Sequence, residues 1–262
     1  MGFASSINPM YALSGLVVGL LVGQTGVGGG SMMTPLLIML FGIHPTTAVG
    51  TDLLFAAITK SCGTVVHGMN KTVDWKITRR LATGSIPATA LTILAMSYFK
   101  VDTHSASVII SMVLGVALIL TALSLILRRK VLEFAGTHLD DLSPARARQL
   151  TILTGAILGV LVSLSSVGAG ALGVTALIFL YPRTRLATIV GSDIAHAVPL
   201  TLCAGMGHWF LGSVDWPLLG TLLLGSIPGI VIGSHLSPHV PEWVLRPVLA
   251  TTLLIVGSKL VL

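Results

Sequence analysis

The chain has 262 residues, of which 53% are hydrophobic and 9% are charged. A soluble domain has roughly a quarter of its residues charged, so this composition excludes a soluble globular protein, whose water-facing surface needs far more charge. The net charge of +6 does not indicate a nucleic-acid-binding protein either, because Lys and Arg gather mostly in short loops between apolar segments, where membrane topology explains them.

Apolar segments follow one another along the chain, and each has at least about the 20 residues that a helix needs to cross a bilayer. They cover residues 10–41, 45–68, 78–99 and 105–127 in the first half, and 150–181, 186–211, 216–235 and 243–262 in the second. The sequence therefore predicts an all-α, polytopic protein of the cell (inner) membrane.

The first segment of each half is too long for one span and is interrupted by glycines. The interruptions read Gln24-Thr-Gly-Val-Gly-Gly-Gly-Ser31 and Ser165-Ser-Val-Gly-Ala-Gly170. Each glycine costs a helix about 1 kcal/mol relative to alanine. We therefore expect a helix, an unwound turn and a second helix in both places, either as two crossings or as a re-entrant pair. Three transmembrane helices are expected to follow each broken pair.

Four motifs recur at a fixed separation of 141 residues (193 − 52 = 141). The pairs are Gly50-Thr-Asp52 with Gly191-Ser-Asp193, His67 with His208, Asp74-Trp75 with Asp215-Trp216, and Gly84-Ser-Ile-Pro87 with Gly225-Ser-Ile-Pro228. Common composition can make glycines coincide, but it does not place aspartate, histidine and Asp-Trp at one spacing. We therefore predict two related transmembrane repeats, residues 1–127 and 150–262, joined by a polar linker at 128–149.

The distribution of Lys and Arg predicts how the repeats are oriented. Loop 69–80 and the linker are rich in these residues, so both are expected in the cytoplasm. The counterpart of loop 69–80, residues 211–216, has none, whereas loop 182–186 has two and its counterpart 42–46 has none. Equivalent loops thus have opposite bias. The repeats are therefore predicted to be inverted in the membrane, with both termini outside the cytoplasm.

Four stretches of this sequence resemble one transporter family. They are Gly26-Val-Gly-Gly-Gly-Ser-Met-Met-Thr-Pro35, His44-Pro-Thr-Thr-Ala-Val-Gly-Thr-Asp-Leu53, Thr59-Lys60 and Gly191-Ser-Asp193. Together they resemble the sulfite exporter TauE/SafE family over nearly the whole chain. The resemblance implies a bacterial-type inner-membrane permease for a small sulfur-containing anion such as sulfite, thiosulfate or an organosulfonate. The second glycine motif lacks Gly-Gly-Gly-Ser, which argues against strict two-fold symmetry of the site.

An anion that crosses lipid needs hydrogen-bond donors in place of its water shell. The N-terminal end of a half-helix supplies free N–H groups, and glycine lets an anion approach them closely. The predicted substrate-binding residues at the two breaks are Thr25, Gly28, Gly29, Gly30, Ser31, Ser165, Ser166, Gly168 and Gly170. The alternative is that these glycines only let helices pack closely, the role predicted for two series spaced four residues apart, Gly15, Gly19 and Gly23, and Gly225, Gly229 and Gly233.

Asp52, Asp193 and Lys60 are charged residues within predicted spans, where an ionisable group is a functional candidate because burying it is costly. Asp52 and Asp193 lie near the starts of their helices, so they either cap free N–H groups or take part in a shared role, holding the site or carrying a proton. Lys60 lies two turns, about 12 Å, beyond Asp52. It is expected to bind the anion, and the alternative is that it neutralises a carboxylate.

Histidines supply further candidates for proton coupling, because histidine titrates near neutral pH. His67 and His208 occupy equivalent positions at the ends of their helices, and the alternative is that they only form hydrogen bonds. His196 follows Asp193 by three residues on the same helix face and is the better relay candidate.

These observations favour a secondary carrier whose site lies near the bilayer midplane between the two broken helices. The expected partners are a small anionic substrate, protons and membrane lipid, with no nucleic acid, cofactor or metal ion. An anion channel is the first alternative. A membrane-embedded enzyme is less favoured, because the chain has neither His-Glu-x-x-His nor Gly-x-Ser-x-Gly.

Overall fold

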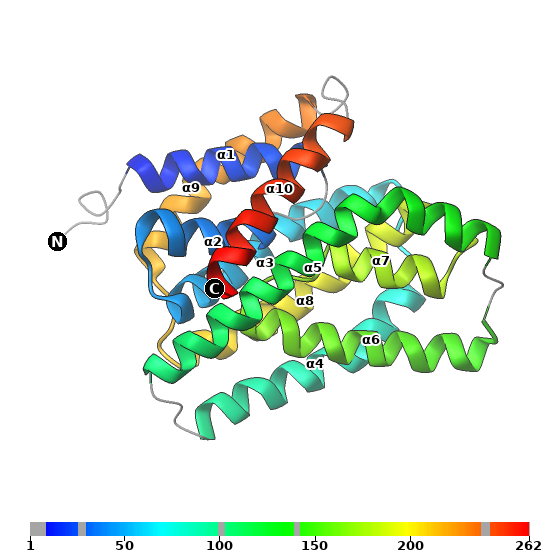
Figure 1. Cartoon of the computed structure of the whole chain (residues 1–262), viewed down its shortest axis with the longest axis horizontal. Coiled ribbons are helices and arrows are strands. Elements are labelled where there is room, and N and C mark those ends of the chain that lie inside the picture. The colour runs from blue at the N-terminus through cyan, green and yellow to red at the C-terminus, as the bar shows by residue number, and fades with distance from the viewer. Residues whose placement is uncertain (1–8, 26–29, 99–102, 139–141, 237–241, 262) are drawn as a thin grey trace.

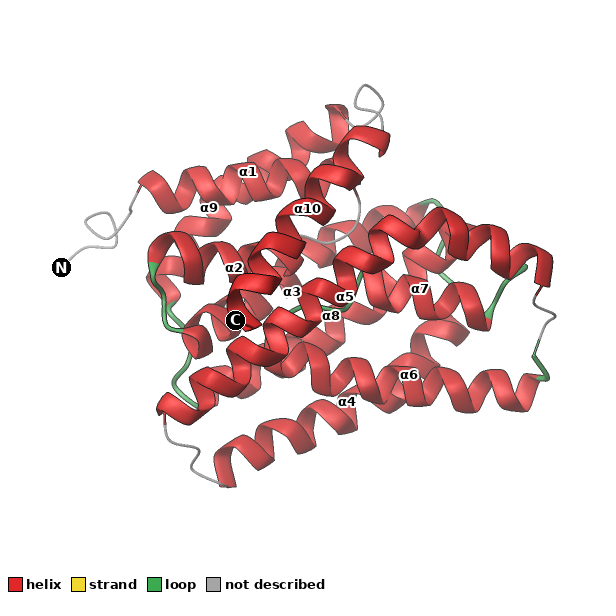
Figure 2. Ribbon diagram, viewed as in Figure 1, coloured by secondary structure: helices red, strands yellow, loops and turns green. Residues whose placement is uncertain are grey.

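A computed structural model of the protein describes residues 9–25, 30–98, 103–138, 142–236 and 242–261. These ranges form ten α-helices, and helix is the only regular secondary structure in them (Figure 2). The first half contains α1 (Pro9–Thr25), α2 (Gly30–Phe41), α3 (Pro45–Met69), α4 (Trp75–Tyr98) and α5 (Thr103–His138). The second contains α6 (Pro144–Ser165), α7 (Ala171–Leu180), α8 (Leu186–Phe210), α9 (Trp216–Leu236) and α10 (Glu242–Val261). The predicted all-α fold is confirmed.

Each half begins with a broken pair of helices, as the glycines predicted. Among the described residues, six helices are long and apolar enough to cross a membrane, namely α3, α4, α5, α6, α8 and α9. At the second break Ser166 ends α6 with φ 59°, and Gly168 and Gly170 follow with φ of 121° and 126°. Glycine adopts such angles readily, which explains why the helix stops here. Residues 26–29 of the first break lie outside the described residues.

The polar linker is largely helical. Helix α5 continues to His138 and α6 begins at Pro144, so the two helices cover most of residues 128–149. Val131, Leu132 and Ala135 form an apolar stripe at helical spacing that packs against the core between α4, α7 and α8. The linker sequence is polar because the other face of this helix is exposed, as the solvent-facing ion pair between Arg129 and Glu133 illustrates.

The two halves exchange contacts reciprocally. Helix α1 packs along α9 and α6 packs along α4 (Figure 1). At these contacts glycines lie directly against the backbone of the facing helix, with no room for a Cβ atom. The pairs are Gly15 with Leu222, Gly19 with Ser226, Gly155 with Leu81, and Gly159 with Ser85. Glycines of α9 approach α1 in the same way, so the packing role predicted for Gly15, Gly19, Gly225, Gly229 and Gly233 is confirmed.

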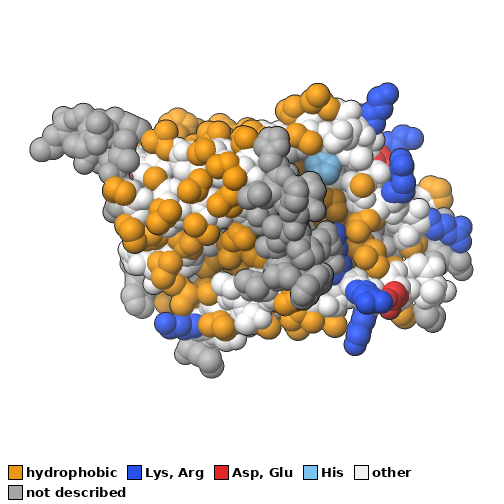
Figure 3. Space-filling view, turned by 90° about the horizontal axis from the view of Figure 1, so that it is seen from above, with side chains coloured by type: hydrophobic (Ala, Val, Ile, Leu, Met, Phe, Trp, Pro, Cys, Tyr) orange, Lys and Arg blue, Asp and Glu red, His pale blue; other side chains and the backbone are white. Residues whose placement is uncertain are grey.

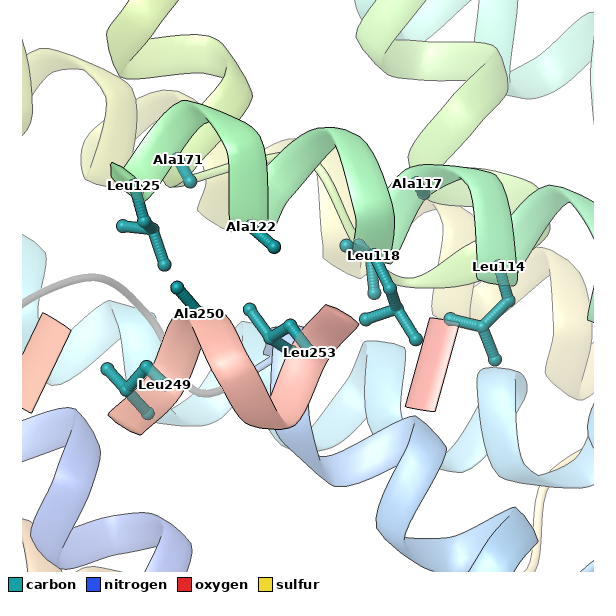
Figure 4. Close-up of a cluster of buried hydrophobic side chains, with 10 residues drawn as sticks. Leu114, Ala117, Leu118, Ala122, Leu125, Ala171, Leu249, Ala250 and Leu253 are labelled. Atoms are coloured by element: carbon teal, nitrogen blue, oxygen red, sulfur yellow. The ribbon is translucent and has the colours of Figure 1, made fainter. Parts of the chain in front are cut away.

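The last helices of the two halves, α5 and α10, pack against each other through a purely aliphatic interface. In Figure 4, Leu118, Ala122 and Leu125 of α5 face Ala250 and Leu253 of α10. All five side chains are buried. This interface closes the bundle around the central helices α3 and α8.

The surface is apolar over most of its area. In Figure 3 hydrophobic side chains cover most of the visible face, whereas Lys and Arg gather mainly at one end. Large side chains such as Leu94, Leu153 and Ile157 are more than half exposed on their helices. Patches of this extent are not found on soluble monomers. With six apolar helices of spanning length, the protein is a multi-pass membrane protein.

Candidate functional site

Helices α3 and α8 pack against each other at the centre of the bundle, and each carries one copy of the repeated Gly-Thr/Ser-Asp motif. Gly50 of α3 lies against the backbone of Ser213, and Gly191 of α8 lies in the same way against the backbone of Thr72. A Cβ atom at either glycine would overlap a carbonyl oxygen. The two contacts are equivalent at the spacing of the repeat, since 191 − 50 and 213 − 72 both give 141.

Thr51 and Ser192, the second residues of the two motifs, form hydrogen bonds with the same loops. Thr51 Oγ1 accepts a hydrogen bond of 3.1 Å from the backbone N–H of Asp215. Ser192 Oγ accepts one of 2.8 Å from the backbone N–H of Asp74. Each half thus holds a loop of the other through its glycine and hydroxyl, and this anchoring fixes the aspartate that follows in each motif inside the protein.

Asp52 is fully buried and is held by α2. Its Oδ2 accepts hydrogen bonds from the hydroxyl and from the backbone N–H of Thr34, the latter at 3.2 Å. Its Oδ1 has no partner among the described residues. The alternative that Asp52 caps its own helix is wrong, because α3 begins at Pro45, two turns earlier. The side chain of Ser166, from the second break, lies close to this carboxylate.

Asp193 is also fully buried, but it is held differently. Neither carboxylate oxygen of Asp193 accepts a hydrogen bond from a described side chain. Oδ1 lies directly against Gly173 of α7, where a Cβ atom would collide with it, and the N–H of Gly170 is directed toward the carboxylate. Asp193 therefore lies at the N-terminal end of α7 and, like Asp52, does not cap its own helix, which begins at Leu186.

Lys60 reaches from the first half into the glycine break of the second. Its side chain is 4% exposed, and Nζ donates a hydrogen bond of 3.1 Å to the carbonyl oxygen of Ala169. Both buried carboxylates, Asp52 and Asp193, attract this ammonium, yet among the described residues neither forms a direct ion pair with it. The equivalent position in the second half is Thr201, whose hydroxyl bonds to its own helix. One cation thus faces two carboxylates.

His196 is buried beside this group. Its Nε2 is 2.8 Å from the hydroxyl of Ser85 on α4, and its Nδ1 has no partner among the described residues. The His196 imidazole also interacts electrostatically with Lys60. The imidazole therefore belongs to the same cluster as the two carboxylates, as its place on the Asp193 face of α8 predicted.

His67 and His208 lie at the ends of α3 and α8, away from this cluster. His208 Nε2 donates to the carbonyl oxygen of Ser163 at 2.9 Å. His67 Nδ1 is 2.8 Å from the hydroxyl of Thr72. Each side chain also lies against the motif glycine of the other half, His208 through its Cβ against Gly50 and His67 through its ring against Gly191. These contacts favour the hydrogen-bonding alternative over proton coupling.

The predicted residues at the breaks fall into three groups. Gly28 and Gly29 lie outside the described residues, and Thr25, Gly30 and Ser31 are helix-end residues whose side chains are not among those described. Gly168 and Gly170 form the turn that Lys60 enters. Ser165 Oγ donates to the carbonyl oxygen of Leu161 at 2.7 Å and so stabilises the turn, whereas the buried Ser166 hydroxyl has no partner among the described residues.

Four contributors were not identified from sequence. Thr34 holds Asp52, Ser85 holds His196, Gly173 makes room for Asp193, and the Ala169 carbonyl oxygen accepts from Lys60. Signals for two of them were present, because Ser85 belongs to a repeated motif and Thr34 to the glycine motif of the first half. The Ala169 carbonyl carried no signal, since any residue type supplies a carbonyl oxygen.

Comparison with known proteins agrees with this architecture. The family model of the sulfite exporter TauE/SafE matches residues 11–260. The chain belongs to this family. A probable membrane transporter protein of Bacillus subtilis (strain 168), YjnA, is 44% identical over 250 residues, which cover 95% of this chain and 98% of YjnA. The family and these relatives identify the protein as a membrane transporter.

More distant relatives carry the same description. The probable membrane transporter protein YdhB of Bacillus subtilis (strain 168) is 27% identical over 93% of this chain and 96% of its own. MJ0441 of Methanocaldococcus jannaschii, also described as a probable membrane transporter protein, is 27% identical over 88% of each chain. No solved structure gives a significant match.

Proposed function

We propose that this member is a secondary carrier that moves a small sulfur-containing anion, such as sulfite, thiosulfate or an organosulfonate, across the inner membrane with a proton. The anion binds at the break between α6 and α7, next to Lys60. The observation that carries the proposal is the buried hydrogen bond from Lys60 Nζ to the Ala169 carbonyl oxygen.

Burial makes this lysine an effective anion ligand. A buried ammonium is stable only when charge or hydrogen bonds compensate it, and here it has one backbone carbonyl and two carboxylates that do not touch it. Two of its three protons therefore remain available for an anion. The N-terminal end of α7, which has no side-chain cap, supplies further N–H donors in the same turn.

The two buried carboxylates are the reason for proposing that a proton is transported with the anion. If Asp52, Asp193 and Lys60 are all ionised, the cluster has a net charge of −2 + 1 = −1, and it would repel an anion strongly in this poorly screened interior. Protonation of one carboxyl group removes that repulsion. Binding of the anion and binding of a proton therefore favour each other, which is the thermodynamic basis of coupled transport.

The arrangement of the halves supports alternating access by inverted repeats. In Figure 1, α1 begins at the left of the molecule and α6, its counterpart, begins at the right. Helices α4 and α6, like α1 and α9, pack across the two halves, so a rocking movement of one half changes both sides of the central site. The Lys- and Arg-rich end of α5 and start of α6 lie on the cytoplasmic side in this proposal.

Flux in proteoliposomes tests the proposal. Uptake of labelled sulfite, thiosulfate, sulfate and a small organosulfonate is measured with and without a pH gradient. A carrier gives saturable uptake, countertransport and accumulation driven by the gradient. Unsaturable, voltage-driven current would support the channel instead, and uptake of sulfate alone would contradict the substrate class.

A further inference from the structure

The two equivalent aspartates have different surroundings, and the difference begins at one pair of threonines. Thr34 of α2 and Thr175 of α7 lie at the 141-residue spacing of the repeated motifs, since 175 − 34 = 141. Thr34 donates its hydroxyl to Asp52. Thr175 instead bonds with the hydroxyl of Ser124 on α5. Asp52 is therefore closed off by α2, whereas Asp193 lacks the corresponding donor.

A small cavity lies where that donor is missing. It is enclosed by α5, α7 and α8, and its walls include Asp193, Gly170, Thr175, Ser124 and Arg128. About 20 Å³ is open to the centre of a water molecule, which exceeds the minimum of roughly 10–15 Å³ that one water needs. The hydroxyls of Ser124 and Thr175 bond to each other, and Asp193 and Arg128 line the same cavity, so polar groups that could bind a water are present in its wall.

The cavity wall contains both the carboxylate and a residue of the basic run of α5. Arg128 stands at the start of the Arg-Arg-Lys run that leads into the α5–α6 connection. Both oxygens of Asp193 lack a hydrogen-bond partner among the described residues. A buried carboxylate in this situation lacks the donors that its charged form needs, and protonation or a water supplies them.

We propose that Asp193, and not its repeat partner Asp52, is the proton-binding site of the carrier, and that it exchanges its proton with water in the cavity between α5, α7 and α8. This inference rests on the proposed coupling to protons. A proton that reaches the cavity water as hydronium passes to a carboxylate oxygen of Asp193 and leaves a neutral water, and this water accepts the proton again as hydronium when the carboxyl group ionises.

The charged and titratable groups facing Asp193 fit this role. Lys60 of α3 attracts the Asp193 carboxylate, and the same lysine interacts with Asp52 and with His196 of α8. Arg128 of α5 lines the same cavity as Asp193. Lys60 stabilises the ionised carboxylate. An anion bound at Lys60 offsets the lysine charge and so favours the protonated form, which couples the two ligands. Asp52 is held by two hydrogen bonds from Thr34 in either case and serves to position α2.

Infrared difference spectroscopy of the protein in bilayers tests the assignment without any transport measurement. Spectra at acid and alkaline pH are compared in the carboxylic acid C=O region for the wild type, Asp193→Asn and Asp52→Asn. We expect one band component to be missing in Asp193→Asn and to be retained in Asp52→Asn. Loss of that component in Asp52→Asn, or in neither variant, would overturn the assignment.

A cavity-filling variant tests the route and leaves both carboxyl groups in place. Ser124→Leu fills the cavity and should slow the appearance of the Asp193 band after a pH jump severalfold. Ser111→Leu is the matched control, because Ser111 is also a half-buried serine of α5, about 20 Å away along the helix. An unchanged rate in Ser124→Leu, or equal slowing in both variants, contradicts the route.

The carrier function and the proton site at Asp193 can each be disproved without disproving the other. If the wild type shows the Asp193 band but no anion flux, the carrier function is wrong and the proton site stands. If anion flux follows the pH gradient in Asp193→Asn as it does in the wild type, the carrier stands and the proton site is wrong.

Discussion

Lys60 Nζ and the carbonyl oxygen of Ala169 form a 3.1 Å hydrogen bond that joins the two halves of the chain inside the membrane. The residues are 109 positions apart, and the carbonyl belongs to the turn that interrupts α6 and α7. A side chain of one repeat thus completes the broken helix of the other. The substrate site that we propose is therefore shared between the repeats.

Replacing Lys60 by methionine removes the charge and keeps most of the side-chain volume. A hydrogen bond to a charged group contributes about 2 kcal/mol, so we expect KM for the anion to rise roughly thirtyfold. Concentration-dependent uptake in proteoliposomes measures it. Lys76→Met is the control, because Lys76 is exposed at the start of α4. A wild-type KM in Lys60→Met would assign Lys60 a purely structural role.

Gly173→Ala should abolish transport and leave membrane insertion intact. The new methyl group would collide with Asp193 Oδ1 and push the carboxylate away from the α7 end. Gly63→Ala is the matched control, because its methyl group would meet only Ile194, at an ordinary 3.4 Å. Uptake by the two variants is compared at equal amounts of inserted protein. Full uptake by Gly173→Ala would show that this approach is not needed.

Gly50→Ala and Gly191→Ala should each lower stability by about 1–3 kcal/mol, because the added methyl group overlaps a backbone carbonyl that cannot move freely. Thermal unfolding in detergent reports the change. Gly68→Ala, at the open end of α3, has nothing within 4 Å of the new methyl group and should leave the transition unchanged. The reciprocal contacts predict similar losses in the two variants, so tolerance of either one is the contradicting result.

Thr34→Val and Asp52→Asn should show strong coupling in a double-mutant cycle. Removing the hydroxyl deprives the buried Asp52 carboxylate of a hydrogen bond, which costs about 1–3 kcal/mol. An asparagine at position 52 needs that donor less, so the second change should cost less in the double variant than alone. Unfolding free energies of the four proteins give the coupling energy. Simple additivity would mean that Thr34 does not stabilise the carboxylate.

The inverted arrangement that we propose predicts that the C-terminus lies outside the cytoplasm. A reporter that is active only in the periplasm, fused after Leu262, should be active, and the same reporter inserted in the α5–α6 connection should be silent. The second fusion serves as the control for the first. Activity from the α5–α6 connection would reverse the orientation.

The order of the helices could be predicted from sequence because lipid imposes a simple rule on it: long apolar segments span, and glycine clusters interrupt them. The end of α5 did not follow this rule. Val131, Leu132 and Ala135 continue the helix within a stretch that looks polar. Average polarity concealed a buried face, which becomes visible only when the stretch is read at helical spacing.

The residues of the site could be predicted better than the hydrogen bonds that they form. Asp52, Asp193, Lys60 and His196 were candidates because ionisable residues are rare within spans, and the structure places them in one cluster. The repeat, however, predicted equivalent roles for the two aspartates. The two aspartates differ because the Thr34 hydroxyl donates to Asp52, whereas the Thr175 hydroxyl bonds with Ser124. Ser124 belongs to a third helix, α5, which thus competes with Asp193 for the Thr175 hydroxyl.

The packing of α1 on α9 and of α6 on α4 has a consequence for how such a chain could originate. The glycine face of α1 fits α9 of the other half, and the glycine face of α6 fits α4 of the first. A half-length ancestor could have covered its own first helix only with a second copy of itself. Joining two copies in one gene then fixed their ratio at one to one. It also freed each copy to change alone, so that only one now carries the lysine.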